Sequence, residues 1–364
     1  MARRSCHWKE ADLPGSASPV AVRASAPLRV DCGNALDLAT IATILQPYDP
    51  CTLNLAVNLR VEVTVEEQDG TCIVVDDETG VTKFGSAAEL SLAGATRLTA
   101  VILHHFQLEG VRVTIRSPVP RGSGLGGSGA VALSLVAACQ TYRRLPAQVA
   151  LSSAELPGLA MLAQSLEAAI TPAPVGLQDH LAAAFGGVSL WEWDARDRMP
   201  PFRRIPIQGA STVLGLNSRL VVGVLREPHV DGGLSRSWSE SVRQGELAMW
   251  IRTAEVTRHF AEAVSAADWA AASAALDEEC ELRVRRWPQV MKGAAVAFRR
   301  AVVACDGAAR FCGGGDGGAV WALIPPHRRQ EFEEAWRTDP ACPDVVLLTP
   351  EVDTEGLVIE CRPS

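Results

Sequence analysis

The sequence predicts an α+β protein with two domains. Apolar, strand-like segments dominate the first half of the chain, whereas long alanine-rich stretches typical of helices dominate much of the second half. Three prolines and Gly209 gather between residues 196 and 216, where we expect the boundary. A chain of 364 residues is also longer than a single hydrophobic core usually supports. We therefore expect a first domain at residues 23–205 and a second at residues 206–364, after a disordered arm rich in Ala, Ser and Pro at residues 1–22.

Several strands and two helices are expected in the first domain. Residues 59–65 and 111–115 alternate or run apolar, and residues 72–75 are a short buried-strand candidate. A glycine-rich loop then leads into an alanine-rich helix, and a Ser-x-x-Glu capping box at Ser152 starts another helix. A strand at residues 187–193 completes this domain.

The second domain is expected to combine long helices with short strands, and a second glycine run lies at residues 313–318. Its expected helices span residues 240–264, 267–284 and 293–305, with a short one near 327–336. Its expected strands span residues 220–225, 319–324, 345–348 and 357–361. Together these elements make a second α+β unit.

The most informative segment is the first glycine-rich loop, Pro-Arg-Gly-Ser-Gly-Leu-Gly-Gly-Ser-Gly-Ala at residues 120–130. Four glycines within six positions allow positive φ angles and a close approach of a ligand to the backbone, because no Cβ stands in the way. The helix that follows directs its free N–H groups and the positive end of its dipole back at the loop. An anion is therefore the expected occupant.

Three nucleotide-binding motifs compete for this loop. The Walker motif is excluded because no lysine follows the glycines. The dinucleotide-binding motif fits only nominally at Gly122, Gly124 and Gly127, because prolines interrupt the entry to the loop and the acidic residue expected about twenty positions later is missing. The third is a Pro-x-x-x-Gly-Leu-Gly-Ser-Ser-Ala loop, which the segment resembles closely except at Gly127 and Gly129. That loop is motif two of the GHMP sugar and metabolite kinases; the alternative is a glycine-rich surface turn.

Two carboxylates follow the loop at positions suited to phosphoryl transfer. Glu167 lies at the end of the capped helix, and Asp179 opens the next helical segment. Magnesium takes a few protein oxygens beside phosphate oxygens, so Ser128 and Glu167 are expected to hold the metal and Asp179 to meet the acceptor hydroxyl. The alternatives are a solvated helix residue for Glu167 and a carboxylate that stabilises a helix N-terminus for Asp179.

The segment around Asp179 makes the resemblance to the GHMP kinases more specific. Residues 176–187 contain Gly-Leu-Gln-Asp-His and end in Phe-Gly-Gly. They look like the Gly-x-Gln-Asp-Gln…Phe-Gly-Gly segment of the heptose-phosphate and fucose kinases, a branch of that family, with His180 in place of the usual glutamine. By this resemblance Asp179 is the catalytic carboxylate.

Motif one of the family has a counterpart near the N-terminus. Residues 26–37 are similar to its Ala-Pro-x-Arg-Ile-Asp…Gly-Gly…Asp pattern, but the stretch is one residue shorter and Asn34 stands where a small glycine is usual. The resemblance implies that Arg29 lies near the transferring phosphoryl group. It also implies that Asp37 binds a sugar hydroxyl.

Motif three is represented by the second glycine run. Residues 311–321 resemble the family's Cys-Gly-Ala-Gly-Gly-Gly-Gly segment, which packs beside the nucleotide loop. Asp316 replaces a glycine, and we expect its carboxylate to point away from the phosphates because like charges repel. Gly314, Gly315 and Arg236, which follows the Asp231-Gly232-Gly233 turn, are expected on the substrate side.

The three motifs occur in family order across residues 23–325. The resemblance implies a GHMP kinase-like fold, with an ATP-binding first domain and the active site in the cleft between the domains, and it implies ATP and Mg²⁺ as cofactors. The residues expected to bind the nucleotide are Pro120, Gly122, Ser123, Gly124, Leu125, Gly126, Gly127, Ser128 and Gly129.

A cluster of arginines offers a further candidate site. Arg283, Arg285 and Arg286 lie beside Trp287, and Arg121 precedes the glycine loop. Such cations suit a phosphate carried by the acceptor. The alternative is a helix end that favours positive charge.

Composition narrows the range of partners. A net charge of −8 argues against nucleic acid. Apolar runs are too short for a membrane span, and no signal peptide is recognisable, so a cytoplasmic location is expected. The ten cysteines and seven histidines lack metal-ligand spacing and are expected to be reduced thiols and ordinary side chains.

The sequence thus predicts an ATP-dependent kinase that phosphorylates a hydroxyl of a sugar or sugar phosphate, acting as a monomer or homodimer. One alternative keeps the fold but takes a non-sugar alcohol, of the homoserine or mevalonate type. The other is a catalytically silent nucleotide- or sugar-binding regulator, which the departures at Gly127, Asn34, His180 and Asp316 favour and the retained Asp179 disfavours.

Overall fold

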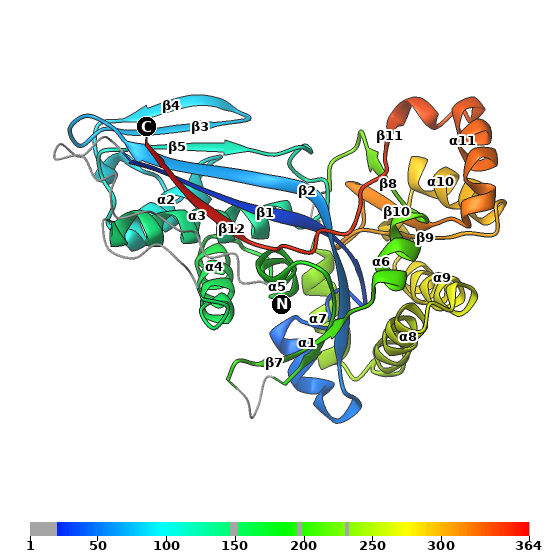
Figure 1. Ribbon diagram of the computed structural model, residues 1–364. Coiled ribbons are helices and arrows are strands. Elements are labelled where there is room, and N and C mark those ends of the chain that lie inside the picture. Colours follow the sequence, from blue (N-terminus) through cyan, green and yellow to red (C-terminus); the bar gives the residue numbers. More distant parts are fainter. Residues whose placement is uncertain (1–19, 146–151, 195–198, 230–232, 364) are drawn as a thin grey trace.

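The computed structural model describes residues 20–145, 152–194, 199–229 and 233–363. It has the expected α+β architecture, with two sheets that carry packed helices (Figure 1). No helix within these ranges is long and apolar enough to cross a membrane. The expected disordered arm lies outside the described residues except for residues 20–22, which pair with neighbouring strands at the start of β1 (Val20–Cys32).

The larger sheet contains eight of the described strands, most of them from the first half of the chain. Its order is β12-β1-β2-β5-β3-β4, and β6 and β7 extend from β2. Besides β1, the strands are β2 (Cys51–Glu67), β3 (Ile73–Asp77), β4 (Gly80–Phe84), β5 (Val111–Arg116), β6 (Val188–Trp193), β7 (Phe202–Ile207) and β12 (Val358–Pro363). The strands expected from sequence at 59–65, 72–75, 111–115 and 187–193 are thereby confirmed within one or two residues or as parts of longer strands.

The end of the chain returns to this first sheet. β12 pairs antiparallel with β1, with Val22 opposite Cys361, and Figure 1 shows the red C-terminal strand lying beside the blue one. β7 likewise pairs with β6. The last strand of the range 206–364 is therefore part of the first sheet, and the division of the remaining chain at residue 205 stays a prediction.

Helices on the larger sheet centre on α3 (Gly127–Arg144), which contacts β1, β2 and three other helices. Small side chains such as Ala132, Ser134 and Ala137 are fully buried along it, which lets neighbouring elements approach from several sides. The other helices of the first half are α1 (Ala39–Ile44), α2 (Arg97–Phe106), α4 (Leu156–Ile170) and α5 (Gln178–Phe185). The N-terminus of α3 is thus held rigidly where the glycine loop ends.

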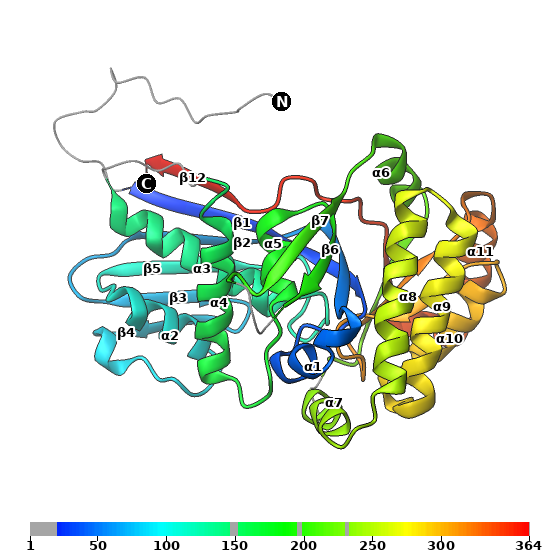
Figure 2. The same cartoon turned by 90° about the horizontal axis from the view of Figure 1, so that it is seen from below.

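The second sheet has the order β11-β8-β10-β9 and carries the remaining helices. Its strands are β8 (Leu220–Leu225), β9 (Ala308–Phe311), β10 (Ala319–Leu323) and β11 (Val345–Leu348). The helices are α6 (Ala210–Asn217), α7 (Leu234–Arg243), α8 (Ala248–Ser265), α9 (Trp269–Arg286), α10 (Ala294–Val303) and α11 (Arg329–Thr338). Figure 2 shows α8 and α9 as a long antiparallel pair at one edge, with α1 and α7 side by side below the sheets.

One expected helix is wrong. Residues 240–264 are not continuous, because α7 ends at Arg243 and α8 begins only at Ala248. Gly245 between them has φ +87°, a left-handed conformation that glycine adopts without steric cost and that ends a helix. The break turns α7 away from α8, so that α7 packs on α1 and its first turn faces the site described below.

Candidate active site

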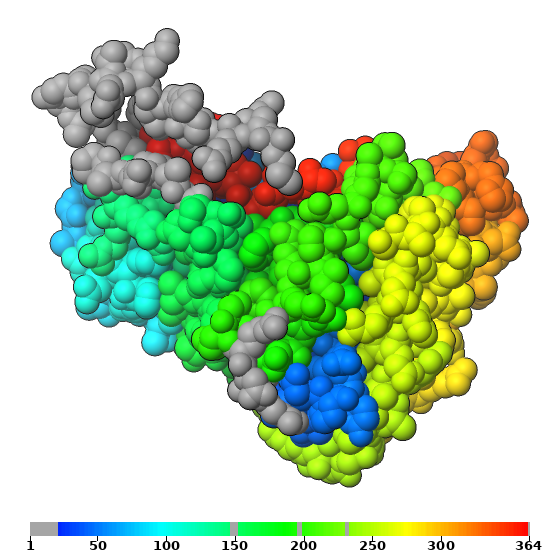
Figure 3. All heavy atoms as spheres, turned by 60° about the horizontal axis from the view of Figure 1, so that its bottom comes forward, coloured from blue at the N-terminus to red at the C-terminus, as the bar shows by residue number. Residues whose placement is uncertain are grey.

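A cavity of about 620 Å³ lies between the glycine loop, the start of α5 and the first turn of α7. Residues that lie far apart in the chain, from Arg29 to Gly314, line it. The blue segment that holds α1 reaches the surface between α7 and α8 in Figure 3, next to the β6–β7 strands. The residues that line the cavity therefore come from both the first and the second half of the chain.

The glycine loop forms one wall of this cavity. Gly122, Gly124 and Gly126 all have positive φ angles, and Gly126 directly precedes α3. The loop packs tightly on the second glycine run: a Cβ at Gly124 would lie 3.2 Å from the Cys312 carbonyl oxygen, and one at Gly318 only 2.8 Å from that of Ser123. These contacts explain why two glycine-rich segments nearly 200 residues apart are needed together.

Most of the expected nucleotide-binding residues line the cavity, but two do not. The lining includes Pro120, Gly122, Ser123, Gly124, Gly126, Gly127 and Ser128. Leu125 is fully buried and its carbonyl oxygen accepts a hydrogen bond from the Arg29 N–H at 3.0 Å. Gly129 lies behind the loop, where a Cβ would stand 2.9 Å from the Asp179 Cβ. These two residues fix the loop against its neighbours.

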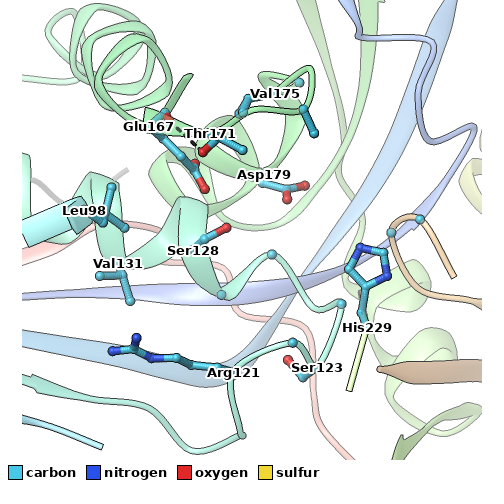
Figure 4. A pocket seen from close by; sticks show the side chains of 18 of the residues that line it. Leu98, Arg121, Ser123, Ser128, Val131, Glu167, Thr171, Val175, Asp179 and His229 are labelled. Atoms are coloured by element: carbon cyan, nitrogen blue, oxygen red, sulfur yellow. Dashed lines mark hydrogen bonds between the residues drawn. The ribbon is translucent and has the colours of Figure 1, made fainter. Parts of the chain in front are cut away.

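Arg29 and Asp179 form an ion pair beside the loop. The Arg29 Nε and Nη2 atoms each lie 2.8 Å from Asp179 Oδ1, and Nη1 donates to the Gly124 carbonyl oxygen at 2.6 Å. The side chain of Arg29 is buried, whereas that of Asp179 is 27% exposed and points towards the cavity (Figure 4). Burial alone would lower the pKa of Arg29, but Asp179 and Asp31 raise it, so the guanidinium stays charged.

Glu167 also lies near Ser128, and Figure 4 shows it above Ser128 and to the left of Asp179. His180 Nε2 lies 2.8 Å from Glu167 Oε2, so the histidine that replaces the family's usual glutamine contacts the expected metal ligand. Burial would raise the pKa of Glu167, but the hydrogen bonds from His180 and Ser128 hold it below its ordinary value. Glu167 is therefore an ionised carboxylate facing the loop.

Ser128 and Glu167 fit the modest demands of magnesium. Within the described ranges, no group of three His, Cys, Asp or Glu side chains is arranged to hold a metal ion. Magnesium needs only one or two protein oxygens when phosphate oxygens and waters supply the others. An ionised carboxylate with a hydroxyl beside it meets this requirement at the N-terminus of α3.

Asp37 lies at the opposite end of the cavity from α2. Its Oδ2 atom accepts a hydrogen bond from the Gln178 N–H at 3.0 Å, and the Gln178 amide Nε2 donates to Asn34 Oδ1 at 2.6 Å. Gly176 passes so close that a Cβ there would collide with the Asp37 carboxylate. Burial raises the pKa of Asp37 to about 6.

A buried charge network that the sequence did not reveal supports this arrangement. Asp31 Oδ1 accepts from the Gly313 N–H at 2.8 Å, and its Oδ2 lies 3.1 Å from Arg310 Nη1. Arg310 Nη2 in turn donates to Glu279 Oε1 at 3.1 Å. Asp31, Arg310 and Glu279 are fully buried. They tie motif one to motif three and place Asp31 against Arg29 at 3.3 Å.

Arg283 lies in the last turn of α9, in agreement with the helix-end interpretation of the arginine cluster, and it is not placed to contact a phosphate in the cavity. Its guanidinium is fully buried, lies 3.3 Å from Glu279 and donates to the Asn34 carbonyl oxygen. The indole rings of Trp238 and Trp250 flank it, with the Arg283 Cζ 5.0 and 4.4 Å from their centroids. Arg283 therefore belongs to the buried network and not to the lining of the cavity.

The remaining expected residues divide between the cavity and its surroundings. Gly314 lines the cavity, whereas Gly315 packs on Val290 outside it. Arg236 is exposed and donates to the Pro172 carbonyl oxygen at 3.3 Å, and it does not line the cavity; the turn before it lies partly outside the described residues. Asp316 pairs with Lys292 at 2.6 Å, away from the cavity, as expected.

His229 is a lining residue that the sequence analysis missed. Its Nδ1 hydrogen-bonds the Gly315 carbonyl oxygen, which can only accept, so Nδ1 carries the proton. The Cε1 and Nε2 atoms of the ring lie against Gly314, where a Cβ would stand 2.9 Å from Cε1, and Figure 4 shows the His229 ring beside the loop. A single histidine before a turn carries no signal in the sequence, because only the packing of two loops brings it to the site.

Comparisons with known proteins agree with this architecture. Residues 92–187, which contain the glycine loop, Glu167 and Asp179, match the family model described as GHMP kinases N terminal domain. This segment is thus similar to the N-terminal domain of the GHMP kinases, in agreement with the resemblance noted in the sequence. No curated protein sequence matched the chain.

Solved structures extend the similarity over nearly the whole chain. A D-glycero-D-manno-heptose 1-phosphate kinase from Bacteriodes thetaiotaomicron is 20% identical, with a TM-score of 0.69 over 93% of this chain and 98% of its own. A Lactococcus lactis galactokinase complexed with galactose is 15% identical, with a TM-score of 0.69 over 93% and 95%. The Methanococcus jannaschii mevalonate kinase is 15% identical, with a TM-score of 0.67 over 93% and 100%. The chain therefore carries a GHMP kinase N-terminal domain and has the fold of these kinases throughout.

Proposed function

We propose that the protein is an ATP-dependent kinase that transfers the γ-phosphoryl group to a hydroxyl of a sugar or sugar phosphate. One observation carries this proposal: the Asp179 carboxylate stands 2.8 Å from the buried Arg29 guanidinium, beside the cavity end of the glycine loop. A glycine loop alone suits many anion-binding proteins. A carboxylate and a cation held together at its end suit the transfer of a phosphoryl group to a hydroxyl.

The loop and the start of α3 would hold the triphosphate. Their N–H groups and the dipole of an 18-residue helix favour negative charge at this point. Apolar side chains, among them Leu98, Ile115 and Val131, line the cavity towards α2 and suit a nucleobase. Bound magnesium would neutralise charge on the phosphate oxygens, with Ser128 and Glu167 as its protein contacts.

Asp179 would receive the acceptor hydroxyl. Its ion pair with Arg29 fixes the position of the carboxylate, which can accept a hydrogen bond from the hydroxyl but is a weak base. Its contribution is therefore chiefly to orient the hydroxyl and to take the proton late, while Arg29 stabilises charge on the transferring group. The acceptor would lie between Asp179 and Asp37.

The similarity to a galactokinase and to a D-glycero-D-manno-heptose 1-phosphate kinase supports a carbohydrate as acceptor. The test is ADP release with a panel of fucose, galactose, heptose phosphates, homoserine and mevalonate, in the natural protein and in Asp179→Asn. Because aspartate is isosteric with asparagine, the variant should fold, and we expect turnover to fall by about 10²–10⁴. Asp306→Asn, a change at an exposed carboxylate far from the loop, is the matched control.

Each outcome decides between the alternatives. Sugar-dependent ADP release that is lost in Asp179→Asn and kept in the control supports the proposal. ADP release with homoserine or mevalonate alone would show that the acceptor is a non-sugar alcohol. ATP binding without release for any acceptor leaves a nucleotide-binding regulator as the function.

A further inference from the structure

The acceptor end of the cavity is bounded by three short segments. Residues 34–38 follow β1, residues 173–178 precede α5, and residues 234–238 form the first turn of α7. In Figure 4, Val175 of the second segment lies on the far side of Asp179 from Leu98 and Val131. We call these three segments the acceptor wall.

The polar side chains that the acceptor wall presents to the cavity are the Asp37 carboxylate, the amides of Asn34 and Gln178, the Ser235 hydroxyl and the Trp238 indole. Asp37 is almost fully buried, and its hydrogen-bond donors among the described residues are two groups of Gln178, at 3.0 Å and 3.5 Å, and its own backbone N–H. No ion pair to Asp37 exists within the described ranges. A buried carboxylate without a cation still has lone pairs to satisfy, and hydroxyl donors of a ligand are the groups that satisfy them.

The arginines that line the cavity lie outside the acceptor wall. Arg29 is already balanced by Asp31 at 3.3 Å and Asp179 at 2.8 Å. Arg121 pairs with Asp77 at 2.7 Å, and Arg97 begins α2, so both stand at the apolar end. The described part of the acceptor wall contains one arginine, Arg236, and no lysine, and Arg236 does not line the cavity.

Arg236 is the nearest cation on α7, and it faces outward. It is exposed, and its Nη2 is bonded to the Pro172 carbonyl oxygen at 3.3 Å on the outside of the wall. A phosphate on the acceptor would therefore be repelled by the Asp37 carboxylate, and no cation on the cavity side of the wall would compensate for this repulsion. At an effective dielectric constant of about 20, one pair of like charges 6 Å apart weakens binding about a hundredfold.

We propose that the acceptor is an uncharged polyhydroxy compound, and that the acceptor wall, through Asp37, rejects acceptors that carry a phosphate or carboxylate. This inference rests on the kinase function proposed above and narrows its substrate class from sugars and sugar phosphates to unphosphorylated sugars. Asn34 and Gln178 would add amide contacts to further hydroxyls. Trp238 would supply an apolar surface.

The test compares matched pairs of acceptors at saturating ATP and Mg²⁺. The kcat/KM for ADP release is measured with galactose and galactose 1-phosphate, with mannose and mannose 6-phosphate, and with mannose and mannosamine. We expect the free sugar to exceed its phosphate about a hundredfold in the preferred pair. Thermal protection by each acceptor, in the presence of a non-hydrolysable ATP analogue, gives a second reading that does not depend on turnover.

The Asp37→Asn variant tests whether the charge of Asp37 causes the preference for free over phosphorylated sugars. Asparagine still accepts the Gln178 hydrogen bond, so the fold should be kept while the charge is removed. We expect the ratio of kcat/KM between free and phosphorylated sugar to fall at least tenfold, whereas Asp306→Asn leaves the ratio unchanged.

The outcomes separate this inference from the kinase function itself. A sugar phosphate, a carboxylate alcohol or mannosamine used better than the free sugar overturns the uncharged acceptor while the kinase function stands. A preference for free sugars that Asp37→Asn leaves intact overturns the role of the wall. No ADP release with any acceptor overturns both the inference and the kinase function.

Discussion

Two glycines in the first turn of α3 provide a sharp test of the site geometry. Gly127 and Gly129 lie two residues apart in the same helix, and neither has a positive φ angle. A Cβ at Gly127 would meet no protein atom within 4 Å. A Cβ at Gly129 would lie 2.9 Å from the Asp179 Cβ and 3.4 Å from the His180 nitrogen. The same substitution by alanine therefore adds a methyl group to open space at one position and against α5 at the other.

The expected effects on stability have opposite signs. Replacing glycine by alanine in a helix stabilises a protein by about 0.4–1 kcal/mol, mainly through the entropy of the unfolded chain. At Gly129 overpacking adds a cost of about 1–3 kcal/mol, because α5 must move away by several tenths of an ångström. We expect Gly127→Ala to raise the free energy of unfolding by up to about 1 kcal/mol. Gly129→Ala should lower it by about 0.5–2 kcal/mol.

The effects on catalysis should also separate. Displacing Asp179 by part of an ångström should lower kcat about tenfold in Gly129→Ala, since a displacement of about 1 Å costs up to about a hundredfold. Gly127 lines the nucleotide end, so its alanine variant should change chiefly the KM for ATP. Urea denaturation and ADP-release kinetics measure both pairs of quantities. Equal stability and equal kcat in the two variants would refute the packing of α5 against α3 described above.

Three further predictions concern charges. Arg310→Met leaves Asp31 and Glu279 buried without their cation. The free energy of unfolding, measured by urea denaturation, should therefore fall by about 3–5 kcal/mol. If Arg310→Met lost less stability than Arg310→Lys, which keeps a positive charge, the buried network would be contradicted. Burial raises the pKa of Asp37 from 3.8 to about 6, so the folded state holds this proton more tightly than the unfolded state, and stability is lost as the pH rises from about 4 to 6. The natural protein should lose about 3 kcal/mol more over this range than Asp37→Asn, and parallel pH profiles would speak against the buried carboxylate. Glu167→Gln should raise the Mg²⁺ concentration for half-maximal activity about ten- to a hundredfold, and an unchanged requirement would remove Glu167 from the metal site.

Much of the site was predictable because its motifs are local. The glycine spacing at residues 120–129 predicts an anion-binding loop before a helix, and the structure has the loop and α3 there. The segment around Asp179 likewise predicts a carboxylate at the start of a helix, and α5 begins at Gln178. Asp316 could be expected to turn outward because a carboxylate among phosphates is unfavourable.

Other features could not be read from the chain. Arg283 looked like a surface cation at a helix end, but Glu279 and the Asn34 carbonyl oxygen hold it in the core. The continuous helix expected at residues 240–264 overlooked Gly245, because alanine-rich periodicity outweighs a single glycine in a pattern. No motif in the sequence indicated that His229 lines the cavity.

By itself the sequence determined the α+β class and the glycine loop before α3, whereas the roles predicted for Arg29 and Asp179 came from the resemblance of their segments to those of the GHMP kinases. The class and the loop depend on backbone freedom and hydrophobic periodicity, which neighbouring residues set among themselves. Only the tertiary structure decided which charges are compensated: Asp31 by Arg310 across 279 positions, and Asp37 by no cation among the described residues. Charge compensation in a core depends on which distant segments pack together, and no local pattern encodes that distance.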